Sequence, residues 1–230
     1  MGKELFKFKM FSVRQERCAM KVGTDGVLLG SWACDETNDK SLKILDVGTG
    51  TGLIALFMAQ RYTNAHITAI DIVPEAIEQA SENFTVSPFG NRLTAIASSL
   101  QELETETKYD AIVCNPPFFV DSLQCPDDKR TLARHARTLT FAELARYSSR
   151  LMTHDGTLSV IIPSESKSQM EAEAIFCGLC ISRVCHIKTK ETKPAKRVML
   201  EFSRCQKHIE NDLIVIGDEK YVSLTSNFYL

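Results

Sequence analysis

A glycine-rich turn between two apolar runs constrains the fold of this chain more than any other feature. Residues 44–47 read Ile-Leu-Asp-Val, residues 48–52 read Gly-Thr-Gly-Thr-Gly, and residues 53–59 are apolar. We interpret them as a buried strand, a tight turn and a helix that begins near Gly52. Glycine at every second position allows positive φ and lets a ligand approach the backbone closely. The chain is therefore expected to be an α/β protein with a ligand at this turn.

The spacing of the glycines indicates which ligand. A dinucleotide-binding turn has the pattern G-x-G-x-x-G and places a pyrophosphate at the helix N-terminus. Here the pattern is G-x-G-x-G (Gly48, Gly50 and Gly52), and Asp46 precedes it. A carboxylate makes no favourable interaction with an anionic pyrophosphate, whereas it would attract the ammonium group of a methionine moiety. The pattern favours S-adenosylmethionine over NAD, although an NAD-dependent enzyme remains an alternative.

A second acid follows about twenty residues later. The β-branched run from His66 ends in Asp71, and an acid at this distance from the glycines can accept hydrogen bonds from both ribose hydroxyls of an adenosyl group. The alternative is that Asp71 only ends a strand before Pro74, the first-turn proline of the next helix. The spacing favours the binding role.

The motif Asn115-Pro116-Pro117-Phe118 follows the apolar run Ala111-Ile112-Val113-Cys114. Each proline fixes its own φ, and Pro116 also keeps Asn115 out of the helical region. The result is a stiff turn that carries an amide oxygen, free carbonyls and an aromatic ring. Such a turn can accept two hydrogen bonds from one amino group while Phe118 stacks on a planar base. A packed proline-rich strand exit is the alternative, and the glycine turn upstream argues against it.

The order of predicted elements defines the fold class. The predicted strands are Leu42–Val47, His66–Asp71, Leu93–Ala97, Ala111–Cys114, Leu158–Pro163, Cys185–Lys188 and Arg197–Phe202. The predicted helices are Leu53–Arg61, Pro74–Asn83, Thr140–Met152 and Lys167–Phe176. Alternating strands and helices predict a Rossmann-like fold, with a mainly parallel seven-stranded sheet and helices on both faces. Ligands of such sheets bind at the carboxyl ends of the strands.

Length and composition exclude several classes of protein. The 230 residues are expected to form one domain, with an N-terminal segment (residues 1–32) and a long loop (residues 119–138) outside the core pattern. No apolar run is as long as a membrane span and the first residues do not resemble a signal peptide, so we expect a cytoplasmic protein. The eight cysteines are then reduced thiols. The cluster Cys177, Cys180, Cys185 and His186 lacks the paired spacing of a zinc site, and we expect no metal.

The net charge of −2 excludes a generally basic nucleic-acid-binding surface, so any contact with nucleic acid must be local. The second half of the loop 119–138 is basic and follows the Asn-Pro-Pro-Phe motif. We expect phosphate contacts from this loop and from a later basic stretch, through Arg130, Arg134, His135, Arg137, Lys193 and Arg197. Scattered surface charge is the alternative.

Together these motifs resemble class I methyltransferases that make N6-methyladenine, whose N-P-P-[FY] motif residues 115–118 match. Residues 17–32 (RCAMKVGTDGVLLGSW) and the C-terminal residues 227–230 (NFYL) are similar to the bacterial tRNA1(Val) adenine-37 N6-methyltransferases. That resemblance covers nearly the whole chain. It implies S-adenosylmethionine as the methyl donor and an adenine beside the tRNA anticodon as the acceptor.

The resemblance also implies a set of site residues. The expected catalytic residues are Asn115, Pro116, Pro117 and Phe118. The expected cofactor-binding residues are Lys21, Thr24, Asp46, Gly48, Gly50, Gly52, Asp71, Ile72, Ser99 and Asn115. Ser99 departs from the family, which tends to have an acid after the third strand to hold the adenine amino group. A hydroxyl accepts a weaker hydrogen bond there, which bears on cofactor affinity and not on the type of reaction.

Besides the NAD-dependent enzyme, three other functions stay open on the sequence alone. A methyltransferase of a protein glutamine amide could use the same Asn-Pro-Pro-Phe motif but does not need a basic loop. A methyltransferase of another nucleic-acid amino group, or a non-catalytic nucleotide-binding module, would also fit parts of the pattern. The sequence indicates no oligomeric state.

Overall fold

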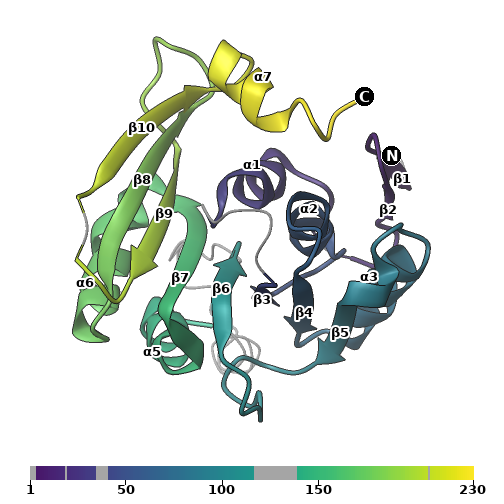
Figure 1. Cartoon of the computed structure of the whole chain (residues 1–230). Coiled ribbons are helices and arrows are strands. Elements are labelled where there is room, and N and C mark those ends of the chain that lie inside the picture. The colour runs from purple at the N-terminus through teal and green to yellow at the C-terminus, as the bar shows by residue number, and fades with distance from the viewer. Residues whose placement is uncertain (1–3, 19, 35–40, 117–138, 207) are drawn as a thin grey trace, which may run out of the picture.

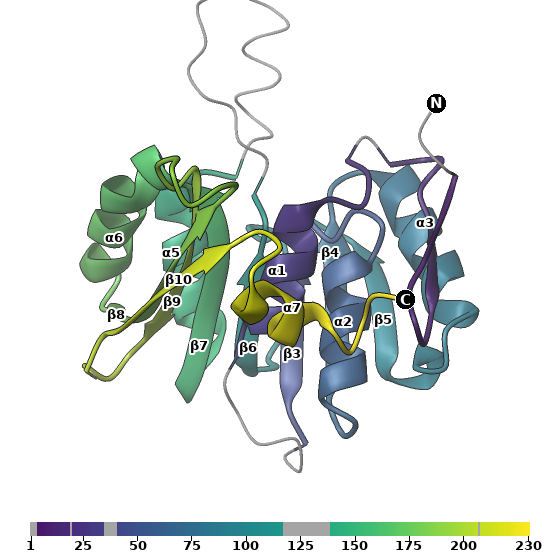
Figure 2. The ribbon, with the colours of Figure 1, turned by 90° about the horizontal axis from the view of Figure 1, so that it is seen from above.

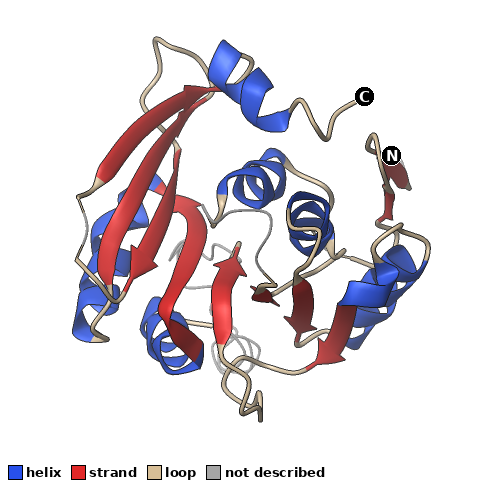
Figure 3. Cartoon of the chain, in the orientation of Figure 1, coloured by secondary structure: helices blue, strands red, loops and turns tan. Residues whose placement is uncertain are grey.

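The computed structural model describes residues 4–18, 20–34, 41–116, 139–206 and 208–230. It contains an eight-stranded sheet with helices on both faces (Figures 1 and 3). The strands, in their order across the sheet, are β10 (Glu210–Val215), β8 (Cys180–Lys188), β9 (Arg197–Ser203), β7 (Met152–Pro163), β6 (Tyr109–Cys114), β3 (Lys43–Val47), β4 (His66–Asp71) and β5 (Leu93–Ala97). Of these only β9 runs antiparallel to its neighbours β7 and β8. The Rossmann-like fold and the mainly parallel sheet are thereby confirmed.

The sheet has one strand more than the seven expected. The additional strand, β10, pairs parallel to β8 at the edge of the sheet. It begins Glu210-Asn211-Asp212, and only Ile214 among its six residues is buried. A solvated edge strand lacks the apolar run by which the other strands were predicted, because it buries little surface.

Two hydrophobic cores lie on opposite faces of the sheet. One packs α1 (Thr24–Trp32), α2 (Leu53–Arg61) and α3 (Pro74–Thr85) against the inner face of the curved sheet in Figure 1. The other packs α5 (Phe141–Leu151) and α6 (Lys167–Phe176) against the outer face. Burial on both faces explains why the central strands read as continuous apolar runs.

The helix α1 lies in the N-terminal segment, where no helix was predicted. Seven of its nine residues are buried, so it shows no amphipathic periodicity. Gly30 allows its close approach to α2, since a Cβ at this position would lie 2.7 Å from Phe57 Cβ. At its C-terminus, Arg61 of α2 donates to the carbonyls of Gly30 (3.0 Å) and Ala33 (2.6 Å).

The N- and C-terminal segments pack together over α2. The short strands β1 (Leu5–Lys7) and β2 (Ser12–Arg14) pair antiparallel, and α7 (Glu219–Thr225) lies against α1 (Figures 1 and 2). Phe228 stacks on Phe57 with 4.0 Å between ring centroids. The backbone N–H of Lys9 donates to the Phe228 carbonyl at 2.8 Å. Neither β1–β2 nor α7 was predicted from the sequence.

Local signals explain the remaining helix boundaries. Thr140 and Glu143 form a capping box at the start of α5, so the helix begins one residue later than predicted. Pro74 occupies the first turn of α3. Within the part of the chain that the structure describes, every helix is too short or too polar to span a bilayer.

Candidate active site

The strand register brings three of the sequence motifs to one edge of the sheet. Val47, the last residue of β3, pairs with Ile70 of β4 on one side and with Cys114 of β6 on the other. The residues that follow these three are Gly48, Asp71 and Asn115, so they leave the sheet side by side. This is the carboxyl edge, where ligands of parallel α/β sheets bind.

The glycine turn uses its backbone donors inside the protein. Four N–H groups are engaged: those of Gly48 and Thr49 donate to the carbonyl of Ile70 (2.9 and 3.0 Å), that of Gly50 to Asp71 Oδ2 (2.9 Å) and that of Gly52 to the carbonyl of Thr49 (2.9 Å). A phosphate-binding turn instead points such donors at the ligand. The geometry therefore argues against a pyrophosphate at this turn and against an NAD-dependent enzyme.

The three glycines have different surroundings. All three have positive φ: 71° at Gly48, 55° at Gly50 and 81° at Gly52. A Cβ at Gly48 or Gly50 would meet no atom within 4 Å, so a ligand has room at both positions. A Cβ at Gly52 would lie 2.4 Å from the ring of Phe84. Gly52 thus lets α3 pack against the start of α2, a role that differs from the expected contact with cofactor.

Asp46 is fully buried beneath the turn. Its Oδ2 accepts from Thr49 Oγ1 at 2.6 Å and from the Ala55 N–H at 3.2 Å, which ties the turn to the first residues of α2. Its Oδ1 is buried without a hydrogen-bond partner among the described residues. Burial raises the pKa of Asp46 to about 7, the nearby Asp71 adds to this, and the two hydrogen bonds oppose it. One oxygen supports the turn and the other is free to accept from a bound group.

Asp71 is held by two backbone donors. Its Oδ2 accepts from Gly50 and its Oδ1 accepts from the Val73 N–H at 3.0 Å. Each carboxylate oxygen keeps further capacity to accept, as binding to ribose hydroxyls requires. The charge of Asp71 also affects the nearby Cys18. The pKa of the Cys18 thiol is raised to about 11, mainly by burial and in smaller part by Asp71.

Asp46 and Asp71 both affect the thiol of Cys114. Burial is the main reason that the pKa of this thiol lies far above its ordinary value, and Asp46 and Asp71 both raise it further. Asp71, together with Asp46 when it is ionised, therefore places negative charge at the carboxyl ends of β3, β4 and β6. Such a field favours a cationic ligand and disfavours a pyrophosphate at the glycine turn.

Asn115 and Pro116 begin the Asn-Pro-Pro-Phe motif beside these acids. Asn115 is half-buried and Pro116 is buried. Asn115 Nδ2 lies 3.9 Å from the Met20 sulfur, and Asn115 Oδ1 is buried without a hydrogen-bond partner in the described part of the chain. Pro117 and Phe118 lie outside the described residues.

The N-terminal segment is fastened to the glycine turn through Asn83 of α3. The buried Asn83 Nδ2 donates to the carbonyls of Arg14 and Thr51, both at 2.9 Å, and Asn83 Oδ1 accepts from the Arg14 N–H at 2.9 Å. Asn83 was not among the predicted site residues. No local pattern marks it, since its partners are 69 and 32 residues away.

Two predicted cofactor residues lie where the N-terminal segment enters α1. Lys21 is exposed, and Thr24 is half-buried as the first residue of the helix. Ile72 follows Asp71 and is 50% exposed, and the next residue, Val73, is 44% exposed.

Ser99 and Glu102 are hydrogen-bonded to each other across a turn. Ser99 Oγ donates to Glu102 Oε2 at 2.9 Å and accepts from the Glu102 N–H at 3.2 Å. One of its two acceptor sites is therefore occupied, which leaves a single weak acceptor for an adenine amino group. The carboxylate of Glu102 is exposed next to it.

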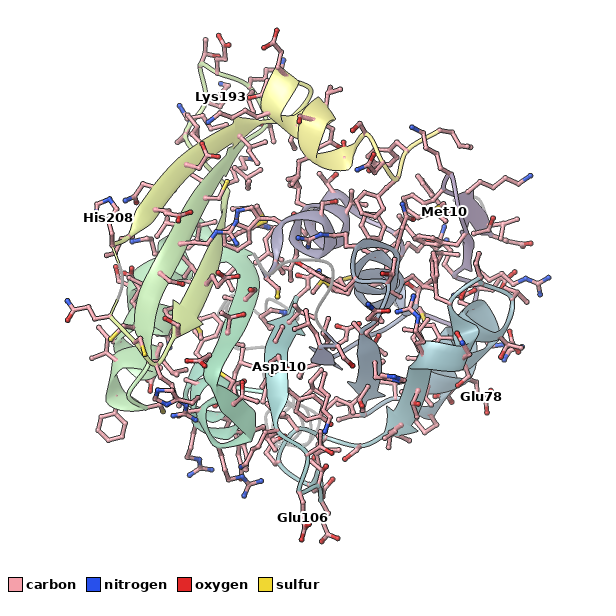
Figure 4. All side chains as sticks on the ribbon, in the orientation of Figure 1. Met10, Glu78, Glu106, Asp110, Lys193 and His208 are labelled. Atoms are coloured by element: carbon pink, nitrogen blue, oxygen red, sulfur yellow. The ribbon has the colours of Figure 1, made fainter. Side chains whose placement is uncertain are left out.

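The predicted basic residues divide into three groups. Arg130, Arg134, His135 and Arg137 lie outside the described residues. Lys193 is exposed in the turn between β8 and β9 (Figure 4). Arg197 begins β9, and its Nε donates to Asp25 Oδ2 at 2.9 Å, so its charge is shared with an acid of α1.

The fold is that of the class I methyltransferases. Over 89% of this chain and 96% of the other, it matches a predicted O-methyltransferase from Agrobacterium tumefaciens with a TM-score of 0.65 at 20% identity. It also matches a putative class I S-adenosylmethionine-dependent methyltransferase from Listeria monocytogenes, with a TM-score of 0.60 at 15% identity, over 86% and 65% of the two chains. Residues 34–177 match the family model of the methyltransferase small domain.

The chain belongs to the tRNA1(Val) (adenine(37)-N6)-methyltransferase family. The protein of that name from Phocaeicola vulgatus is 44% identical over 100% of this chain and 99% of its own length. The protein of that name from Parabacteroides distasonis is 47% identical over 88% of this chain and 85% of its own length. The resemblance seen in the sequence is confirmed.

The cofactor of this enzyme is S-adenosylmethionine. Three features of the described residues fit it: the open space at Gly48 and Gly50, the buried Asp46 Oδ1 that has no partner among these residues, and the negative field of Asp71 and of ionised Asp46. S-adenosylmethionine carries a positive sulfonium and an ammonium group, which that field attracts. The assignment of individual residues to parts of the cofactor stays a prediction.

Proposed function

We propose that this enzyme transfers a methyl group from S-adenosylmethionine to N6 of adenine 37 in tRNA1(Val). The single observation that supports this most is the position of Asn115. Its amide oxygen has no hydrogen-bond partner among the described residues and lies at the carboxyl end of β6, beside the glycine turn that follows β3. The names of the full-length relatives, which specify this tRNA and this base, agree with that chemistry.

The proposed reaction requires acceptors for the exocyclic amine. The lone pair of this nitrogen is delocalised into the adenine ring, which makes it a poor nucleophile. Asn115 Oδ1 and the Pro116 carbonyl would accept its two protons and let the nitrogen pyramidalise. Positive charge that develops on the nitrogen strengthens both bonds in the transition state, which is the differential binding that catalysis needs.

The remaining groups position the reactants. S-adenosylmethionine supplies the methyl group and the sulfonium leaving group. Asp71 would hold the adenosyl ribose, and the glycine turn would hold the methionine part next to Asp46. Phe118, which lies outside the described residues, would stack on the acceptor base after it leaves its neighbours. A base of an anticodon loop is less constrained than one in a duplex, so its extrusion costs less.

We further propose that the tRNA is bound at the carboxyl edge of the sheet by local basic residues. The β8–β9 turn carries Lys190, Lys193 and Lys196 at this edge, because β8 runs parallel to β7 and β9 begins opposite the end of β7. Arg130, Arg134, His135 and Arg137 of the loop 119–138 would add phosphate contacts. A tRNA substrate also implies a cytoplasmic protein.

The test is to incubate the purified protein with methyl-labelled S-adenosylmethionine and, separately, with tRNA1(Val) transcript and with total cell protein. Nuclease digestion of the RNA should yield labelled N6-methyladenosine, and a transcript with guanine at position 37 should yield none. Label on glutamine side chains with none in RNA would instead establish the protein-amide methyltransferase. Binding of the cofactor without transfer to either acceptor would establish a non-catalytic module.

A further inference from the structure

Met20 of the N-terminal segment contacts the proposed catalytic residue. Its sulfur lies 3.9 Å from Nδ2 of Asn115, a residue 95 positions away in the sequence. Met20 is 52% exposed, whereas Met58, Met170 and Met199 are fully buried in the cores. An exposed methionine at the carboxyl edge is therefore not explained by core packing.

The contact is chemically selective for one end of the Asn115 amide. A thioether sulfur has no proton to donate and acts only as a weak acceptor, so it pairs with the NH2 end. The opposite end, Oδ1, is buried and has no partner among the described residues. The reverse orientation would put the amide oxygen against the sulfur lone pairs and bury the N–H donors without an acceptor, which is costly.

We propose that Met20 is a positioning residue that sets the orientation of the Asn115 carboxamide. By holding Nδ2, it leaves Oδ1 for the amine of the acceptor base. This matters because an amine donates two N–H bonds, and a carboxamide that presented its own NH2 would oppose them. The inference rests on the proposed function in one respect: Asn115 is taken as the residue that accepts from the base.

The packing of the N-terminal segment explains how Met20 stays in place. Gln15 Oε1 accepts from the Val22 N–H at 2.7 Å, which closes the segment around Met20. Asn83 joins Arg14 to the carbonyl of Thr51 in the glycine turn. The same segment is therefore joined to the cofactor turn through Asn83 and contacts the Asn-Pro-Pro-Phe motif through Met20, and it can align the two halves of the site.

The kinetic test compares Met20→Leu with Met10→Leu. Leucine keeps the apolar bulk but removes the acceptor, and Met10 is an equally exposed methionine (51%) on the N-terminal hairpin (Figure 4). We expect Met20→Leu to lower kcat about three- to tenfold, the scale of one modest hydrogen bond, with unchanged Tm and unchanged affinity for S-adenosylmethionine. Met20→Gln, whose Oε1 can accept from Nδ2, should recover most of the rate. Met10→Leu should match the parent.

A measurement without turnover tests the contact itself. The side-chain NH2 resonances of Asn115, assigned by their loss in Asn115→Asp, should shift and exchange faster with water in Met20→Leu but not in Met10→Leu. Unchanged kcat and unchanged resonances in Met20→Leu would overturn the inference. So would a lower Tm together with a loss of cofactor affinity as large as the loss of kcat, because the effect would then be on folding and cofactor binding. If the parent transferred no methyl group to RNA, the proposed function would fail, and the resonances would still decide the role of Met20.

Discussion

Arg197 and Asp25 form an ion pair, with Arg197 Nε 2.9 Å from Asp25 Oδ2. The pair joins the start of β9 to the first turn of α1 at the carboxyl edge of the sheet. A basic residue that looks like a phosphate ligand in the sequence is thus already engaged with an acid. Lys193, four residues earlier, is exposed, and the two residues should behave differently.

Replacement of Lys193 by alanine should weaken tRNA binding. The logarithm of the binding constant should also fall less steeply with the logarithm of the salt concentration, by about one unit of slope for the loss of one phosphate contact. Arg197→Ala should change the slope less and should lower stability by less than about 1 kcal/mol, because the pair is partly exposed. Lys43→Ala, at the opposite end of the sheet, is the control. If filter-binding titrations gave equal salt slopes for Lys193→Ala and Lys43→Ala, Lys193 in the β8–β9 turn would not contact the RNA.

Substitution at Gly50 and at Gly52 should separate ligand binding from folding. A side chain at Gly50 meets no protein atom but projects where a ligand has room, so Gly50→Val should abolish binding of S-adenosylmethionine while the protein stays folded. The positive φ of 55° adds about 1–2 kcal/mol of backbone strain. Gly52→Ala should destabilise the fold by about 1–3 kcal/mol or more, because its Cβ would overlap the Phe84 ring.

Calorimetric titration and thermal unfolding measure the two effects. Cofactor affinity in Gly50→Val equal to that of the parent, or binding of NAD by the parent protein, would contradict the assignment of the turn.

The carboxyl group of Asp46 should make stability fall as pH rises. Its folded pKa of about 7 lies above the ordinary value of 3.8, so the folded state holds a proton that the unfolded state has lost between these values. Its contribution is therefore complete below about pH 4 and is lost as pH rises through about 7. Asp46→Asn removes this dependence. At about pH 8 this variant should be more stable than the parent, by an amount on the order of 4 kcal/mol for a pKa raised from 3.8 to about 7.

Urea unfolding of the parent and of Asp46→Asn across this pH range gives the difference in their unfolding free energies. Groups other than Asp46 are common to both proteins, so their titration cancels in this difference. A constant difference in unfolding free energy from about pH 4 to about pH 8 would show that Asp46 is not a buried, protonated acid.

Asn115→Ala should lower kcat by roughly a hundredfold or more while cofactor affinity stays nearly unchanged, by analogy with the loss of one preorganised polar group. The control is Asn211→Ala on the exposed edge strand β10, which should keep the parent rate. Single-turnover methylation of tRNA measures the effect on chemistry. A rate for Asn115→Ala within a few-fold of the control would place the catalytic acceptor elsewhere.

Ser99→Asp should strengthen the binding of S-adenosylmethionine by about three- to tenfold, since a charged acceptor makes the stronger hydrogen bond to an adenine amino group. Aspartate can still accept from the Glu102 N–H as serine does at 3.2 Å. It cannot donate to Glu102 Oε2 as serine does at 2.9 Å, so the exposed Glu102 carboxylate must turn away into solvent for the local turn to survive. Isothermal calorimetry of both proteins with the cofactor and with free methionine tests this. If Ser99→Asp also bound free methionine more tightly, the gain in affinity would not come from the adenine.

The sequence by itself determined the central strands, the glycine turn and the Asn-Pro-Pro-Phe motif. These features are local: strands buried on both faces are continuous apolar runs, and glycine and proline restrict the backbone wherever they stand. The parallel order of strands then required the motifs to share one edge. The residues that bind the cofactor or the base were inferred from spacing and resemblance, and their individual roles stay predictions.

Only the tertiary structure decided the features that depend on distant partners. The helix α1 is buried nearly all round and so has no amphipathic pattern, and β10 exists because the edge of β8 offers it a partner. Asp46, predicted to face an ammonium group, uses one oxygen to hold the turn because Thr49 and Ala55 lie against it. The contact of Met20 with Asn115 joins residues 95 positions apart, and no local pattern can specify it because it exists only once the N-terminal segment has packed against the finished sheet.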